Sequence, residues 1–258
     1  MNLGVHGYST SQERVVLERS LDFQPDFISI GFCLNDVTEP VILEEELGGY
    51  DYHEVVKSSN VLAGWLTNET GFGRLHARLA ARGRTLDEER LAEVDRIREM
   101  ALASTTDPRF EKSWSHVFTN LERVYEIGRE QDTPVVLLVF PFTFQLLGDD
   151  ALRAPQRALA AHAKKHGVDV IDFTPIFRDA IFDDPGLLGD LRARGYDDDA
   201  IAAFFTRRVE EYFYDADHPT PIGHELVARH LVAWMAARGL VELPSNAGAL
   251  PVALANRY

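Results

Sequence analysis

The stretch Pro134–Phe140, PVVLLVF, gives the clearest strand signal in the chain. An uncharged apolar run of this length, opened by a proline, indicates a strand with both faces buried, as in the parallel sheet of an α/β protein. Before it, apolar residues recur at helical spacing, at Trp114, Val117, Phe118, Leu121, Val124 and Tyr125. This order predicts an amphipathic crossover helix that leads into a parallel strand.

The same alternation extends to both sides of this unit. Downstream, Ala151–His166 is typical of a helix and Val168–Phe173 of the next strand. Upstream, the short apolar run Asp26–Phe32 fits another buried strand, and it is preceded by a very short strand at Asn2–Val5 and a helix from about Ser11 to Leu21. Repeated strand–helix–strand units predict an α/β fold with a parallel sheet.

One long segment departs from this alternation. From Val37 to about Pro108 the chain loses strand character and becomes helical and highly charged, which we interpret as a cap inserted over the sheet. The acidic, glycine-containing stretch Asp183–Asp199 is expected to be a loop that walls the same cleft. With 258 residues and 45% hydrophobic content, the chain can form one large α/β domain. We expect a single domain over residues 1–258, with a helical insertion at about 37–108.

Composition excludes several classes of protein. The formal net charge of −15 argues against a nucleic-acid partner or an anionic membrane surface. Cys33 is the single cysteine, so an internal disulfide and a cysteine-rich metal site are excluded. No apolar run approaches the roughly 20 residues that span a bilayer, and MNLGVHGYST lacks the basic and apolar regions of a signal peptide. We expect no cofactor and no metal ion, and the sequence assigns neither a location nor an oligomeric state.

The chemistry concentrates in Tyr214–His224, YDADHPTPIGH. Prolines stop any helix from running through this stretch, so Asp215 and His218 should lie in a turn. Thr220 is a suitable N-cap, and a proline at the first position opens the helix that follows. In such a turn the Asp215 carboxylate can accept the Nδ1 proton of His218, leaving Nε2 to take a proton from a nucleophile. The stretch predicts half of a hydrolase triad, with a plain capping role for Asp215 as the alternative.

A zinc peptidase motif begins nearby but is not completed. His224 and Glu225 match the start of H-E-x-x-H, but the position of the second histidine is occupied by Ala228. His230 lies on a different face of the helix. We therefore reject a zinc peptidase.

Three features now occur together: Gly7 in a turn after the first short strand, Asn35 at the end of the next, and Asp215-x-x-His218 before the last helix. In this combination the chain resembles the SGNH (GDSL-type) esterase and lipase family. The resemblance implies a three-layer α/β/α sandwich with a flavodoxin-like parallel sheet. It covers Met1–Phe32 and then Trp114 to about Val241.

The resemblance also implies roles for these residues. The backbone N–H of Gly7 and the side-chain amide of Asn35 correspond to the donors of an oxyanion hole, which stabilise a developing tetrahedral oxyanion. Asp215 and His218 correspond to the acid and base of the triad. The implied activity is hydrolysis of O-acyl or O-acetyl esters through an acyl-enzyme. The expected substrate is a neutral small-molecule or carbohydrate ester, because the acidity of the segments around the cleft disfavours anionic esters.

Two departures from the family pattern stand out. Cys33 occupies the position where the family has glycine, a replacement by another small residue. The family's first block, a G-D-S that supplies the nucleophilic serine on the first strand, should precede the block that contains Gly7, and residues 1–258 contain no G-D-S. We therefore expect the first strand to be missing from this sequence, and residues 1–258 alone to be inactive as a serine hydrolase.

Three alternatives stay open. The chain could be a non-catalytic α/β binding domain that keeps the oxyanion loops. Gly7–Ser11 imitates the G-x-S-x-G nucleophile elbow, which would make Ser9 the nucleophile, although Ser11 replaces the final glycine. Cys33 could also act as a thiol nucleophile paired with His218.

Overall fold

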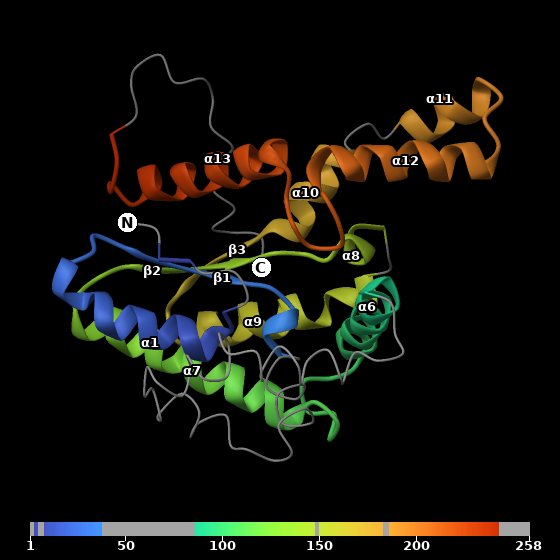
Figure 1. Ribbon diagram of the computed structural model, residues 1–258. Helices are drawn as coiled ribbons and strands as arrows, with labels where there is room; N and C mark the ends of the chain where they lie inside the picture. Colours follow the sequence, from blue (N-terminus) through green and yellow to red (C-terminus); the bar gives the residue numbers. More distant parts are fainter. Residues whose placement is uncertain (1–2, 5–7, 38–85, 148–149, 183–185, 243–258) are drawn as a thin grey trace.

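A computed structural model describes residues 3–4, 8–37, 86–147, 150–182 and 186–242 (Figure 1). At its centre lies a parallel sheet with the strand order β1-β2-β3. The strands are β1 (Ile28–Phe32), β2 (Val135–Val139) and β3 (Asp169–Asp172). Ile28 pairs with Val135 at the start of β1, and Val139 pairs with Asp172 at the end of β3.

Helices cover both faces of this sheet (Figure 1). One face carries α1 (Thr10–Ser20), α7 (Glu111–Glu130) and α9 (Ala154–Lys165). The other face carries α10 (Phe173–Phe182) and α13 (Pro221–Ala237). Other helical elements in the described ranges are η1 (Leu21–Phe23), α6 (Leu86–Leu102), α8 (Thr143–Leu147), η2 (Asp150–Arg153), α11 (Leu187–Ala193) and α12 (Asp198–Tyr212), and Asn35–Val37 are also helical. The predicted three-layer α/β/α sandwich is confirmed.

The central strand β2 explains why the sequence pattern was so clear. Each of its residues is buried, because Leu137 and its same-face neighbours pack under α1 and α7 while Val136 and Leu138 pack under α10 and α13. A strand covered on both faces needs apolar residues at every position rather than at alternate ones. The predicted parallel strand and its crossover helix α7 are both present.

Strand β1 is built differently. Ile28, Ile30 and Phe32 are buried on the α1/α7 side, whereas Ser29 and Gly31 are exposed on the other. Among the described residues β1 pairs with β2 alone, so its other edge has no strand partner there. Of the expected strand Asn2–Val5, Leu3 and Gly4 are not in strand conformation, and the other residues lie outside the described part of the chain.

The expectation of a loop over Asp183–Asp199 is wrong. Residues Leu187–Ala193 form helix α11, and α12 begins at Asp198 after Asp197 caps it by accepting from the N–H of Ala200. The glycines suggested a loop, but Leu191 is buried and supplies the apolar anchor that a short helix needs. In the predicted helical insertion, at about 37–108, residues Leu86–Leu102 form helix α6. Residues 38–85 lie outside the described ranges.

Candidate active site

The turn between α12 and α13 carries the predicted acid–base pair, and its backbone is tightly closed. Phe213 and Pro219 form an antiparallel bridge, and the N–H of Tyr214 donates to the carbonyl oxygen of His218 at 2.8 Å. These contacts hold the two ends of the turn together, so Asp215 and His218 project from a fixed scaffold rather than from an open loop.

Thr220 and Gly223 fix this turn to the start of α13. The Thr220 hydroxyl donates to the carbonyl oxygen of Glu211 at 2.6 Å and accepts from the N–H of Gly223 at 3.3 Å, which confirms the predicted N-cap. A Cβ on Gly223 would lie 2.4 Å from the carbonyl oxygen of Tyr212. Gly223 is therefore needed for the close approach of α13 to the end of α12.

Asp215 contacts the His218 imidazole with both carboxylate oxygens. Oδ1 and Oδ2 each lie 2.9 Å from His218 Nδ1, which is the hydrogen bond predicted from the sequence. Oδ1 also accepts the backbone N–H of His218 at 2.9 Å and that of Asp217 at 3.1 Å. The Asp215 carboxylate thus both caps the turn and orients the imidazole.

These contacts set the charge state of Asp215. Burial alone would raise the pKa of Asp215, but the N–H donors of His218 and Asp217 and the His218 side chain together lower it below its usual value. Asp215 is therefore ionised at neutral pH and holds a proton on Nδ1, which makes Nε2 the basic nitrogen of the neutral ring. The side chain of His218 is 52% exposed, so solvent and small molecules reach it.

A second carboxylate, Asp217, was not singled out from the sequence. Its Oδ1 lies 3.3 Å from His218 Nδ1. In the sequence Asp217 is only the second acidic residue of the D-A-D-H stretch. Such a residue is more simply explained as a solvated part of a turn, because its distance from His218 depends on how the turn folds. Asp217 adds negative charge beside the imidazole.

The turn lies at the carboxyl ends of the strands. The carbonyl oxygen of Ala216 accepts from the N–H of Thr143 at 2.7 Å, at the start of α8 just after β2. Burial, with the carboxylates of Asp217 and Asp36, raises the pKa of Cys33, the residue after β1, well above its usual value. Ligands of open α/β sheets bind at this edge.

The two predicted oxyanion donors differ in what the structure describes. Asn35 is half-buried at the start of the helical segment Asn35–Val37, which follows β1 after Cys33 and Leu34. There Asp36 Oδ2 accepts the N–H of Cys33 at 3.2 Å. Gly7 lies outside the described residues. The structure therefore brings Asp215 and His218 into direct contact and places the loop of Asn35 at the same edge of the sheet.

The alternative nucleophiles do not fit their environments. Ser9 is buried, has an ordinary extended backbone with φ −91° and ψ 171°, and donates from its hydroxyl to Gln12 Oε1 at 3.1 Å as part of the cap of α1. A nucleophile elbow instead needs a strained residue whose hydroxyl is presented to substrate. The raised pKa of Cys33 keeps its thiol protonated, which disfavours a thiolate nucleophile.

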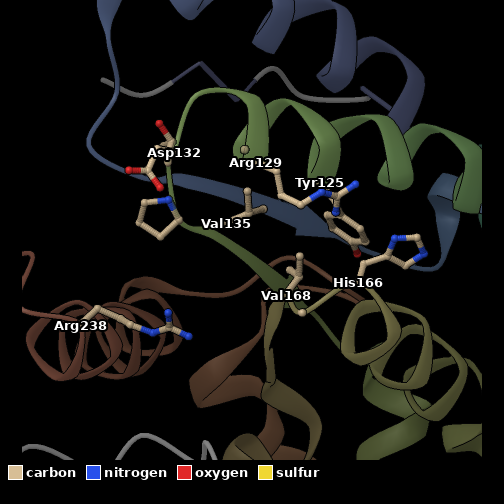
Figure 2. Close-up of a pocket in the computed structure, with 11 residues that line it drawn as sticks. Tyr125, Arg129, Asp132, Val135, His166, Val168 and Arg238 are labelled. Carbon is tan, nitrogen blue, oxygen red and sulfur yellow. The ribbon is translucent and has the colours of Figure 1, made fainter.

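A cavity of about 280 Å³ lies elsewhere, at the amino ends of β2 and β3 (Figure 2). It is lined by side chains of α7, including Tyr125 and Arg129, by His166 after α9 and by Arg238 after α13. The strands run away from this edge towards the Asp215 turn, so the cavity is not the cleft of the acid–base pair.

Fold and site together define an α/β/α protein with an aspartate-oriented histidine at the carboxyl edge of a parallel sheet. A model of the GDSL-like Lipase/Acylhydrolase family matches residues 1–226, and the chain therefore belongs to that family. Membership confirms the predicted family and gives the protein a general esterase or acylhydrolase function. Searches of curated proteins and of solved structures returned no match. Among the described residues no helix is both long and apolar enough to cross a membrane.

Proposed function

We propose that this protein hydrolyses neutral O-acyl or O-acetyl esters through an acyl-enzyme, with His218 as general base and Asp215 as its orienting acid. The observation that carries the proposal is the contact of both Asp215 oxygens with His218 Nδ1 at 2.9 Å. A carboxylate so placed selects the tautomer whose Nε2 accepts protons and stabilises the imidazolium that forms.

The proposed steps follow from this geometry. As a serine oxygen bonds to the ester carbon, His218 Nε2 takes the hydroxyl proton and the carbonyl π electrons move to the oxygen. When the C–O bond to the alcohol breaks, His218 returns the proton to the leaving alkoxide, and an acyl-serine is formed. Water then attacks the acyl-serine with the same proton transfers, releasing the acid and the serine.

We assign the oxyanion hole to Asn35 and Gly7. The position of Asn35 just after β1, at the carboxyl edge of the sheet, supports the first assignment. The second rests on the family resemblance of the sequence around Gly7. Loss of one such donor costs about 3 to 4 kcal/mol in the barrier, so removal of the Asn35 amide should be felt mainly in kcat.

We further propose that the nucleophile is the serine of a G-D-S strand that pairs with β1. No G-D-S occurs in residues 1–258, and the edge of β1 away from β2 has no strand partner among the described residues. An edge with unpaired N–H and C=O groups is a template for another parallel strand. The carboxyl end of that strand would lie beside Cys33 and the Asp215 turn, where the serine would meet His218.

The charge around the site supports a neutral substrate. Asp36, Asp215 and Asp217 all lie near the imidazole or the end of β1, and the chain as a whole carries a formal charge of −15. Such a field repels anionic esters from the cleft. Short acyl esters and acetylated sugars are therefore the substrates to test first.

The experiment compares two proteins: residues 1–258, and the same chain extended by the in-frame upstream sequence where this encodes G-D-S. We expect the extended protein to hydrolyse p-nitrophenyl acetate and residues 1–258 alone to be inactive. Turnover by residues 1–258 would disprove the assignment of the nucleophile. No turnover by the extended, cooperatively folded protein on neutral esters would instead favour the non-catalytic binding domain. A preference for a succinyl over an acetyl ester would overturn the proposed substrate class.

A further inference from the structure

We propose that Glu122, His162 and His166 form a binding site for a divalent transition metal of the zinc type. His162 and His166 lie four residues apart near the end of α9 and so share one face of the helix. Glu122 reaches them from α7, the neighbouring helix on the same face of the sheet (Figure 1). The cluster is separate from Asp215 and His218, and the proposal does not depend on the esterase assignment.

The distances within the cluster match the coordination shell of such an ion. His162 Nε2 lies 3.2 Å and His166 Nε2 3.4 Å from Glu122 Oε1. One donor atom from each of the three residues lies within 4.8 Å of the other two. With zinc–ligand bonds of about 2.0 to 2.1 Å, neighbouring donors in a tetrahedral site lie about 3.3 Å apart. The distances from Glu122 Oε1 to the Nε2 atoms of His162 and His166 are both close to this value.

Hydrogen bonding within the cluster is incomplete in a way that suits a shared central ion. His162 Nε2 contacts Glu122 Oε1 at hydrogen-bonding distance. His166 Nε2 is buried and within 3.4 Å of the same oxygen, yet it makes no hydrogen bond to any residue in the described part of the chain. Donor atoms that surround a metal are close to one another without pointing at one another, and this is the arrangement of His166 and Glu122.

The surroundings keep both rings in place. The His162 ring stacks on Phe118 with centroids 4.6 Å apart, and the His166 ring lies 5.7 Å from that of Tyr125, which Figure 2 shows beside it. An imidazole that is already oriented binds a metal without first losing its rotational freedom.

The donor set selects the class of ion. Two imidazoles and one carboxylate suit zinc and similar borderline cations, whereas magnesium and calcium prefer oxygen ligands. Three protein ligands leave a fourth position for water. The side chain of Glu122 is 44% exposed, so solvent reaches the cluster. A bound ion would join α7 to α9 and so stabilise the folded state.

The test uses untagged protein freed of metal by chelation. We expect zinc to bind one per chain in competition with a chromophoric chelator, and to raise the midpoint of thermal unfolding by several degrees. A His162→Gln/His166→Gln variant should bind at least about tenfold more weakly and show no thermal shift. His224→Gln, which alters an exposed histidine of α13, is the matched control and should behave like the original protein.

Zinc binding by a Glu122→Gln variant and competition by magnesium decide the outcome. Glu122→Gln alters a partly exposed side chain and keeps both histidines, so it tests the site even where the double variant does not fold. It should also weaken zinc binding, whereas magnesium should not compete. Equal zinc affinity in the original protein and Glu122→Gln, absence of one-to-one binding, or displacement of zinc by magnesium would each overturn the proposal.

Discussion

Two carboxylate–imidazole sites in the described part of the chain differ in construction. Asp215 and His218 meet within a single turn and are 46% and 52% exposed. Glu122 meets His162 across 40 residues of sequence and two helices, and the side chains of His162 and His166 are only 12% and 18% exposed. The first site is local and open to solvent, whereas the second depends on packing and is largely covered.

The difference shows how geometry decides the chemistry of the same residue types. Asp215 takes one nitrogen of a single ring and leaves the other to accept protons, which is the arrangement of a base. Glu122 faces the Nε2 atoms of two rings with one oxygen, which is the arrangement of a ligand set. A histidine beside a carboxylate is therefore informative only when the environment of both ring nitrogens is known.

Replacement of His218 should have the largest effect. In the ester-hydrolysing extended protein, His218→Ala should lower kcat by about 10⁴- to 10⁶-fold, because the general base is lost. Stability should change little, since the side chain is half-exposed. Steady-state kinetics on p-nitrophenyl acetate measure this, with His224→Ala as control. Activity within about tenfold of the original protein would exclude His218 as the base.

The two carboxylates beside His218 can be separated by a matched pair of variants. Asp215→Asn should lower kcat by about 10³- to 10⁴-fold, because an amide cannot hold the required tautomer or balance the imidazolium charge. Asp217→Asn should cost less than about tenfold, because Asp217 Oδ1 lies 3.3 Å from His218 Nδ1, whereas both Asp215 oxygens lie 2.9 Å from it. Equal losses in both variants would contradict the assignment of Asp215 as the orienting acid.

The sequence predicted those parts of the molecule whose structure depends on residues that are close together in the chain. The apolar run of β2, the crossover helix α7 and the Thr220 cap are local patterns, and the Asp215–His218 contact spans one turn. The Glu122 cluster was missed because only packing brings α7 to α9. Its visible signal was the spacing of His162 and His166 in H-A-K-K-H, which alone is typical of any solvated helix face.

Glycine also shows the limit of local patterns. The sequence alone does not distinguish the packing of Gly189 from that of Gly223. In the structure a Cβ at Gly223 would meet the backbone of Tyr212, whereas one at Gly189 in α11 would meet nothing within 4 Å. The sequence cannot make this distinction because it depends on the approach of a second segment.

This contrast gives a third expected result. Gly223→Ala should lower the free energy of unfolding by about 1 to 3 kcal/mol, because the backbone of Tyr212 must move to admit a methyl group. Gly189→Ala, in an open helical position, should raise it by up to about 1 kcal/mol. Urea unfolding of both variants measures the difference. A neutral Gly223→Ala would show that the α12–α13 turn is not held by this close approach.

The smallest expected effect is the pH dependence of stability, which separates the two sites. Burial lowers the pKa of His162, helped by the charges of His166 and Lys165 and opposed by Glu122, so below about pH 6.5 the unfolded chain binds this proton more readily than the folded protein. The free energy of unfolding should therefore fall as pH drops from about 6.5 towards the lowered pKa. The pKa of Asp215 is also lowered, so its contribution is fully present above about pH 3.9 and is lost only as pH falls through the lower folded value.

Urea unfolding in the presence of a metal chelator, at intervals from neutral to strongly acidic pH, should show both losses. His162→Gln should remove the loss that begins near neutral pH and leave the acidic one, whereas Asp215→Asn should reduce only the acidic one. If the His162→Gln variant loses as much stability between about pH 6.5 and pH 5 as the original protein, the cluster of Glu122, His162 and His166 does not control stability in that range.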